Sequence, residues 1–205
     1  MYDEHRDAFC RNLQQITGVV LAGGQGRRMG GVDKGLQPLN GQPLVEHIIA
    51  RLRPQVGHLV INANRNLQAY AAFGYPVLAD AVPDFAGPLA GLHAALSAAQ
   101  TPWVVTVPCD SPFLPVDLVF RLFSALTAAS AEIAVARTGE QVYPVFCLCR
   151  RELLPHLDDY LARGERKFGR WYADLQAVEV AFDDQAQAFE NINTREELSR
   201  FERLI

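Results

Sequence analysis

A glycine-rich, positively charged segment carries most of the chemical information in the sequence. Residues 21–34 read LAGGQGRRMGGVDK and include five glycines. Arg27, Arg28 and Lys34 outnumber Asp33, which gives this segment a charge of +2 in a chain whose formal net charge is -4. Glycine lets the backbone turn tightly and brings its N–H groups close to a ligand, while the cations attract anions. We therefore expect the segment to bind a phosphate-bearing ligand.

Two common phosphate-binding motifs do not fit this segment. A Walker A loop needs Gly-Lys-Ser/Thr, whereas here Asp33 precedes Lys34 and Gly35 follows it. A dinucleotide-binding GxGxxG pattern that begins at Gly24 ends on Met29 instead of glycine. The segment therefore indicates another class of nucleotide-binding protein.

Three further polar residues lie in or next to predicted strands. Asp110 follows a buried strand and precedes Ser111 and Pro112, which places it at the same sheet edge as the glycine-rich segment. Asn62 interrupts an apolar strand, where its amide group needs a partner, and Asp80 follows a shorter strand. Each also has an ordinary explanation: an Asx turn for Asp110, a structural hydrogen bond for Asn62 and a turn for Asp80.

Strands and helices alternate along the first 130 residues, which predicts a single, doubly wound, mainly parallel α/β sheet flanked by helices. Continuous apolar runs predict strands buried on both faces, and apolar residues at helical spacing predict helices that cover them. We expect strands at 16–22, 58–63, 76–79, 103–107, 133–136, 142–148 and 177–182, and helices at 43–54, 88–100, 118–126, 152–161 and from Thr194, where Thr194 and Glu197 form a capping box.

Composition excludes several classes of protein. The chain has 205 residues, of which 49% are hydrophobic and 20% charged, as in ordinary globular domains. A net charge of -4 argues against nucleic acid and anionic membranes as general partners. No apolar run is long enough for a membrane span, the first residues do not resemble a secretory signal, and the four cysteines form no CxxC pair. We therefore expect a cytoplasmic protein.

The motif LAGGxxxRMGxxK closely resembles the signature of nucleotidyltransferases, which transfer NMP from an NTP to a phosphate acceptor. Within that superfamily the sequence is similar to the molybdenum cofactor guanylyltransferases. The resemblance covers most of the chain and also rests on the motifs at residues 17–24, 32–34, 62–64, 87–91, 108–110, 164–166 and 191–194. It implies a Rossmann-like nucleotidyltransferase fold over residues 16–205, with GTP bound by residues 16–130 and the acceptor by residues 131–205. Residues 1–15 form an extension without a counterpart.

The resemblance also implies the reaction and the residues that perform it. GMP would pass from GTP to the phosphate of molybdenum-loaded molybdopterin, with Mg²⁺ as cofactor and pyrophosphate as the second product. The implied GTP-binding residues are Leu21, Ala22, Gly23, Gly24, Arg28, Gly31, Lys34, Asn62, Asp80, Gly91 and Asp110. Among these, Arg28, Lys34 and Asp110 would be catalytic.

The metal and the acceptor involve residues closer to the C-terminus. The resemblance assigns Mg²⁺ to Asp110 and Asn193, although helix capping also explains Asn193. It assigns the acceptor to Arg166, Asn191 and Asn193. Arg166 belongs to a basic segment, residues 163–170, with a charge of +3, which would equally suit an exposed helix face.

Two other functions remain open from the sequence. One is a cytidylyltransferase for the same cofactor or a nucleotidyltransferase for a sugar or alditol phosphate. The Leu-Ala-Gly-Gly and Pro-Leu-Ala-Gly motifs favour GTP over CTP, because cytidylyl relatives typically lack them. The other is a GTP-binding module without turnover, against which the presence of Lys34 and Asp110 argues. We expect a monomer, and the lability of the cofactor in this family suggests a cofactor-delivery or acceptor protein as partner.

Overall fold

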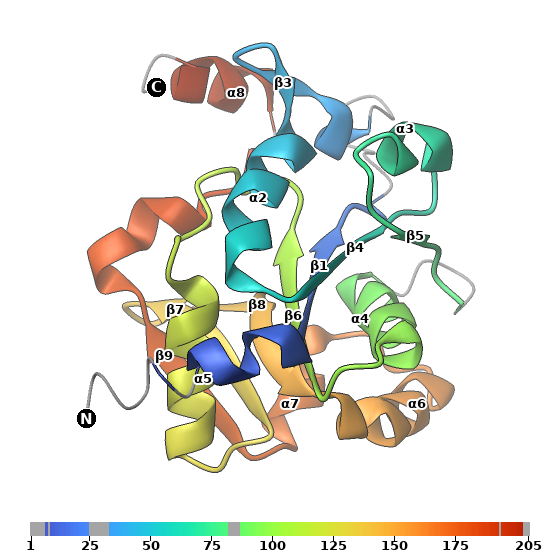
Figure 1. Cartoon of the computed structure of the whole chain (residues 1–205), viewed down its shortest axis with the longest axis vertical. Helices are drawn as coiled ribbons and strands as arrows, with labels where there is room; N and C mark the ends of the chain where they lie inside the picture. Colours follow the sequence, from blue (N-terminus) through green and yellow to red (C-terminus); the bar gives the residue numbers. More distant parts are fainter. Residues whose placement is uncertain (1–6, 8, 25–32, 82–86, 193, 203–205) are drawn as a thin grey trace.

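A seven-stranded sheet with helices on both faces forms the framework (Figure 1). The computed structural model describes residues 7, 9–24, 33–81, 87–192 and 194–202. The strand order is β5-β4-β1-β6-β8-β7-β9. These strands are β1 (Ile16–Leu21), β4 (His58–Asn62), β5 (Val77–Leu78), β6 (Trp103–Pro108), β7 (Ile133–Thr138), β8 (Gln141–Arg150) and β9 (Ala177–Ala181). Within this sheet, only the described pairs that include β8 are antiparallel.

The apolar run of β1 explains why it lies in the middle of the parallel part of the sheet. All six of its residues are buried. Successive side chains point to opposite faces of a strand. Ile16 and Val20 therefore pack into one hydrophobic cluster, and Val19 and Leu21 into another. A strand that is covered on both faces needs such a continuous run, as the sequence predicted.

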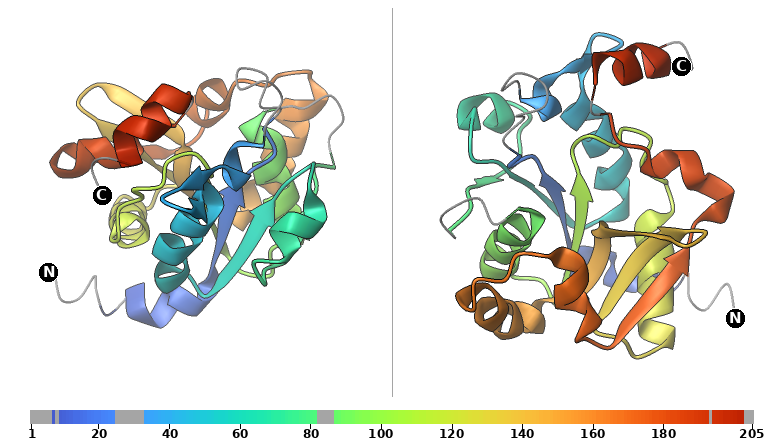
Figure 2. Two further views of the ribbon diagram at one scale, coloured as in Figure 1. Left: turned by 90° about the horizontal axis from the view of Figure 1, so that it is seen from above. Right: turned by 180° about the vertical axis from the view of Figure 1, so that it is seen from behind.

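Different helices cover the two faces of the sheet (Figure 2). The cluster that includes Val20 is completed by α2 and α5, and the cluster that includes Val19 by α4, α6 and α7. Two shorter helices, α3 and α8, lie toward the edge where β1 and β6 end (Figure 1). The bounds are α2 (Leu44–Leu52), α3 (Leu67–Ala71), α4 (Pro88–Ala98), α5 (Leu118–Ala128), α6 (Leu154–Ala162), α7 (Phe168–Ala173) and α8 (Arg195–Glu202).

The structure confirms the predicted fold class and every predicted strand and helix, with ends that differ by a few residues. The helix expected from residue 152 begins as a 3₁₀ turn (Arg151–Leu153) before α6. The capping box is present: the Thr194 hydroxyl accepts a hydrogen bond from the Glu197 N–H at 3.1 Å, and the Glu197 carboxylate accepts one from the Thr194 N–H at 3.0 Å.

Apart from 3₁₀ helices, three elements in the described residues were not predicted. The helices α3 and α7 have five and six residues, too few for an apolar periodicity to stand out. The third is a small hairpin of β2 (Pro38–Leu39) and β3 (Gln42–Pro43), which turns at Asn40 and Gly41. Both turn residues have positive φ, 50° and 82°, as the type I′ turns of two-residue hairpins require. The Asn-Gly pair was the available signal.

The segment before β1 packs against the domain. Phe9 is 9% exposed, and its ring contacts Phe120 and Phe123 of α5 with centroid distances of 5.6 and 5.9 Å. These contacts attach the N-terminal segment to the face that α5 covers. In the part of the chain that the structure describes, no helix combines the length and the apolar character that crossing a membrane requires.

Candidate active site

The candidate residues gather at the edge where β1, β4 and β6 end. Leu21 is in register with Asn62 on one side and with Pro108 on the other. Backbone hydrogen bonds continue for one more residue, from the Ala22 N–H to the Asn62 carbonyl at 2.8 Å and from the Cys109 N–H to the Leu21 carbonyl at 3.1 Å. The glycine-rich segment, Asn62 and Asp110 therefore leave the sheet side by side, which is where open α/β sheets bind ligands.

Lys34 and Asp110 form an ion pair at this edge. The Lys34 Nζ lies 3.2 Å from the Asp110 Oδ2, and the two side chains are 22% and 15% exposed. Burial raises the pKa of Asp110 above its usual range, and Lys34 opposes this shift by its charge and its hydrogen bond. The carboxylate is therefore held where additional positive charge would stabilise its ionised form.

A segment near the C-terminus lies against Asp110. The Ile192 N–H donates a hydrogen bond to the Asp110 carbonyl at 2.8 Å, and the Ser111 hydroxyl donates one to the Asn191 Oδ1 at 2.6 Å. Ser111 is fully buried, so this contact fixes the Asn191 side chain beside the metal-site candidate. Asn193 lies outside the described residues, as do Arg28 and Gly31 of the glycine-rich segment.

Asn62 and Asp80 belong to one hydrogen-bonded cluster, which also contains Asn64. The Asn62 Nδ2 donates to the Asp80 Oδ1 at 2.8 Å and to the Leu78 carbonyl at 3.2 Å. The Asn64 Nδ2 donates to the Asp80 Oδ2 at 2.6 Å, and the Asp80 N–H donates to the Asn64 Oδ1 at 2.8 Å. Asn62 therefore has the structural partner that a buried amide needs. The same contacts hold the Asp80 carboxylate at the edge of the site.

Gly91 and Gly23 leave space for the two asparagines. A Cβ atom on Gly91 would lie 2.4 Å from the Asn62 Oδ1 and 2.6 Å from the Leu21 Cδ2. A Cβ atom on Gly23 would lie 2.9 Å from the Asn64 Nδ2. Gly91 was predicted to bind GTP, and the structure shows a reason for glycine at this helical position that needs no ligand. Gly24, in contrast, is exposed and has open space around its Cα.

A second hydrogen-bonded cluster lies next to Lys34, and the sequence did not predict it. The Asp33 carboxylate accepts hydrogen bonds from the hydroxyl of Tyr70, which lies in α3, and from the Nδ2 of Asn66, which precedes α3. Tyr70 is fully buried. A buried tyrosine in a short helix looks like an ordinary core residue in a sequence, so no signal identified it. For Asn64, the signal was its spacing of two residues from Asn62, which places both on one side of an extended chain.

Arg166 is held by its own segment. Its Nη1 donates to the carbonyls of Leu161, at 2.9 Å, and Glu165, at 2.7 Å. These contacts lie at the end of α6, which packs with α4 on one face of the sheet. Within the basic segment, Arg170 lies in α7 and pairs with Glu165 at 3.6 Å. Arg166 and Arg170 are exposed, as the sequence suggested, and they contact Glu165 and the carbonyl of Leu161 at the end of α6.

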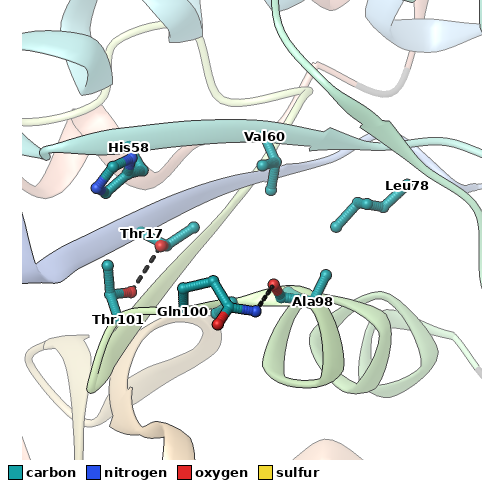
Figure 3. A pocket seen from close by; sticks show the side chains of 9 residues that line it. Thr17, His58, Val60, Leu78, Ala98, Gln100 and Thr101 are labelled. Carbon is teal, nitrogen blue, oxygen red and sulfur yellow. Dashed lines mark hydrogen bonds between the residues drawn. The ribbon is translucent and has the colours of Figure 1, made fainter.

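A cavity of about 220 Å³ lies away from these residues (Figure 3). Thr17, His58 and Thr101, at the amino ends of their strands, line one part of it, and the C-terminal half of α4 lines another. The Thr17 and Thr101 hydroxyls are hydrogen-bonded at 2.6 Å. The clusters described above lie at the opposite ends of β1 and β4, so this cavity is not the candidate active site.

Comparisons with known proteins agree with this geometry. Residues 18–178 match the model of the MobA-like NTP transferase domain. The chain is 57% identical over 192 residues to a molybdenum cofactor guanylyltransferase of Ralstonia nicotianae, with 89% of this chain and 94% of the relative covered. It is 56% identical over 192 residues to the protein of that name from Cupriavidus taiwanensis, with 91% and 96% covered.

A solved structure supports the fold. The crystal structure of molybdopterin-guanine dinucleotide biosynthesis protein A from Archaeoglobus fulgidus superposes with a TM-score of 0.75 at 24% identity. The superposition covers 92% of this chain and 97% of that one. At this identity the likeness concerns the fold, while the identities above 50% concern the family. The chain belongs to the MobA-like NTP transferase domain family and, within it, to the molybdenum cofactor guanylyltransferases.

Proposed function

We propose that this chain transfers GMP from GTP to the phosphate of molybdopterin, releasing pyrophosphate and forming the molybdopterin guanine dinucleotide. Relatives between 52% and 57% identical carry the name of this activity. The observation that carries the proposal is the Lys34–Asp110 ion pair, which lies at the ends of adjacent strands next to a glycine-rich segment. A cation for phosphates and a carboxylate for a metal ion are thereby about 3 Å apart.

The reaction asks for positioning and charge stabilisation. An oxygen of the acceptor phosphate attacks the α-phosphorus of GTP, and the bond from that phosphorus to the oxygen bridging to the β-phosphate breaks. Pyrophosphate leaves with the electron pair. Because the attacking phosphate is already an anion, no side chain has to remove a proton. Lys34 stabilises the charge that develops on the leaving pyrophosphate, and the Gly23 and Gly24 N–H groups bind the triphosphate.

Base selection is assigned to the Asn62–Asp80–Asn64 cluster together with the end of β1, Leu21 and Ala22. Guanine presents an N2 amino group as a hydrogen-bond donor, and carboxylate and amide oxygens are suitable acceptors for it. The two asparagines hold the Asp80 carboxylate through both of its oxygens, which fixes its orientation before a ligand binds. A fixed acceptor discriminates against a base that lacks the matching donor, because one buried polar group is then left unpaired.

The residues around Asp110 fit Mg²⁺. This ion prefers hard oxygen ligands in octahedral geometry and usually takes one or two carboxylates together with substrate phosphates. Asp110 offers a mostly buried carboxylate whose ionised form lacks sufficient stabilisation, as its raised pKa indicates. Among the described residues no group of three or more His, Cys, Asp or Glu is placed to hold a metal ion. Asp110, together with Asn193 as the family resemblance implies, would hold Mg²⁺, which would neutralise phosphate charge.

The acceptor is assigned to the C-terminal part of the chain. Asn191 lies beside Asp110 through Ser111, so it is close to where the two phosphates would meet. Arg166 uses one nitrogen for its two carbonyl contacts, and a guanidinium group has five N–H donors. Arg166, Asn191 and Asn193 are the residues to which we assign the acceptor's phosphate and pterin.

The proposal is tested by measuring pyrophosphate release with GTP, CTP, ATP and UTP, each with and without molybdopterin and with and without Mg²⁺. We expect release only with GTP, acceptor and metal together. Release with CTP would keep the reaction and overturn the assignment of the base. Binding of GTP without release in any mixture would contradict the proposed transfer.

A further inference from the structure

Asp33 uses its side chain in an unexpected way. It is the N-terminal flanking residue of the 3₁₀ turn formed by Lys34–Leu36, and an aspartate there usually accepts hydrogen bonds from the backbone N–H groups of the turn it precedes. Here no such capping bond is made. Its Oδ1 accepts from the Tyr70 hydroxyl and its Oδ2 from the Asn66 Nδ2, at 3.0 Å. Both oxygens thus bond to residues more than 30 positions along the chain.

The surroundings of Tyr70 are shaped for this contact. The Tyr70 side chain is fully buried, and burial together with the nearby Asp33 and Cys109 raises its pKa far above the ordinary range, so that it remains a proton donor. Gly35 lets the hydroxyl approach, because a Cβ atom at Gly35 would lie 2.5 Å from the Tyr70 oxygen. The next nearest atom would be the Cys109 Sγ at 3.4 Å, an ordinary contact.

The residue between Asp33 and Gly35 is Lys34, whose Nζ reaches Asp110. The backbone on both sides of Lys34 is therefore fixed by the same hydroxyl group, through a hydrogen bond on one side and a close approach on the other. We propose that Tyr70 is a positioning residue, which holds the Asp33 carboxylate and thereby places Lys34 for the triphosphate. This inference rests on the proposed function, in which Lys34 binds the phosphates that leave as pyrophosphate.

A purely structural role makes a different prediction. Tyr70 also belongs to the hydrophobic cluster that α2 and α5 complete, so its removal would loosen that cluster. Such loosening would affect every ligand of the edge alike. Misplacement of Lys34 would affect GTP, which carries the β- and γ-phosphates, and would spare GMP, which lacks them. The ratio of the two affinities therefore separates the two roles.

The experiment compares dissociation constants for GTP and GMP in the full chain and in the variants Tyr70→Phe and Lys34→Ala. Tyr70→Phe keeps the ring and removes only the hydroxyl. Because hydrogen bonds to charged groups are among the stronger ones, we expect roughly 10-fold weaker GTP binding and a change below about 2-fold for GMP. Tyr160→Phe is the matched control, since it removes another buried hydroxyl, which bonds to the Lys167 carbonyl at 2.9 Å. Its GTP-to-GMP ratio should equal that of the parent chain.

Two combined variants sharpen the test. Once Lys34 is alanine, adding Tyr70→Phe should change GTP binding little, because the two residues act on one contact. Gly35→Ala should reproduce the selective loss of GTP binding by displacing the hydroxyl, and should add little in a chain that already carries Tyr70→Phe. Gly35→Ala also provides the answer if Tyr70→Phe proves too unstable to measure.

The outcomes distinguish this inference from the function on which it rests. If the parent chain binds GTP no more tightly than GMP, or if Lys34→Ala leaves their ratio unchanged, the proposed role of Lys34 is wrong and the inference fails with it. If Lys34→Ala lowers the ratio while Tyr70→Phe weakens both ligands equally or neither, the function stands and the positioning role of Tyr70 is overturned.

Discussion

The part of the sheet formed by β1, β4 and β6 and the part formed by β8, β7 and β9 are held together by different interactions. At the edge where β1, β4 and β6 end, buried and partly buried polar side chains bond to one another: Asp33 with Tyr70, Asn62 with Asp80, and Lys34 with Asp110. Across the sheet, around β8 and β9, aromatic rings pack on one another. Phe189 lies there at centroid distances of 5.0, 4.8 and 5.2 Å from Tyr143, Phe146 and Phe182.

On the proposed function, this difference separates residues that stabilise the fold from residues that would bind the substrate. Ring packing contributes to stability without leaving polar groups to satisfy. A buried or partly buried polar cluster contributes little net stability, because its hydrogen bonds replace bonds that the same groups make to water in the unfolded chain. Its benefit is a fixed arrangement of donors and acceptors. We therefore expect substitutions at the polar edge to alter activity more than stability, and substitutions in the aromatic region to do the reverse.

The largest effect is expected for Asp110→Ala. Loss of the carboxylate removes the proposed metal ligand, and turnover should fall at least ~10²-fold while the protein stays folded. Pyrophosphate release and a circular dichroism melt of the same sample measure both quantities. Because burial raises the pKa of Asp110 and so disfavours its charged carboxylate in the folded chain, the variant should melt no lower than the parent at a pH where that carboxylate is ionised. Full activity of Asp110→Ala would disprove the metal assignment.

Lys34→Ala should weaken the binding of GTP at least ~10-fold and that of GMP far less, because on the proposed function the lost cation contacts the phosphates that GMP lacks. Calorimetric titration with the two nucleotides measures the difference. Arg53→Ala, which removes an exposed cation at the far end of α2, serves as the control. Equal losses for GTP and GMP would mean that Lys34 shapes the edge without contacting the triphosphate.

Gly91→Ala tests how closely α4 packs against Asn62 and Leu21, to which the base of GTP is assigned. Alanine is normally better than glycine inside a helix by about 0.5–1 kcal/mol. Here its Cβ would collide with Asn62 and Leu21, and we expect a loss of about 1–3 kcal/mol in the free energy of unfolding, together with weaker GTP binding. Denaturant titration measures the first effect. Gly169→Ala in α7, where a Cβ would lie 4.0 Å from the Tyr172 ring, should be neutral or stabilising.

The smallest effect is expected for the ion pair of Arg121 and Asp184, which lies beside β9. Arg121 bonds to Asp184 at 2.9 and 3.0 Å and lowers the pKa of that exposed carboxylate. A lowered pKa stabilises the fold above the unfolded value of about 3.9, and this contribution disappears as the pH falls through the folded value. Asp184→Asn should therefore lower the melting temperature slightly at pH 7 and not at all in strong acid, with GTP binding unchanged.

A matching substitution completes that experiment. Glu140→Gln removes another exposed carboxylate in the turn between β7 and β8 and should not change the melting temperature at either pH. A loss of GTP binding in Asp184→Asn would mean that the region around β8 and β9 affects the candidate site at the ends of β1, β4 and β6, which would contradict the comparison.

The sequence predicted those parts of the molecule that local patterns determine. The apolar run of Ile16–Leu21, the helix at Leu44–Leu52 and the capping box at Thr194 follow from the spacing of a few neighbouring residues. The placement of Asp110 beside Lys34 was also predictable, because the carboxyl ends of parallel strands meet at one edge. The family resemblance added the roles of these residues.

Long-range partners could not be predicted in the same way. Nothing near Tyr70 in the sequence indicates that its hydroxyl meets Asp33, 37 positions away, and nothing near Ser111 indicates Asn191, 80 positions away. Such pairs depend on how α3 and the C-terminal segment pack against the edge. Gly91 is a similar case. The family resemblance assigned it to GTP binding, and only the structure shows that its lack of a Cβ also leaves room for the Asn62 side chain.

The C-terminal segment has a consequence for the order in which the protein matures. Ile192 bonds to Asp110, and α8 contributes Phe201 to a small apolar cluster with Leu39 of the β2–β3 hairpin and Leu44 of α2. During synthesis on the ribosome, the glycine-rich segment and both strands beside it emerge long before these last residues. The edge therefore gains these contacts only after all seven strands of the sheet have been synthesised. A nascent chain arrested before residue 190 would contain nearly the whole sheet and still lack a finished site.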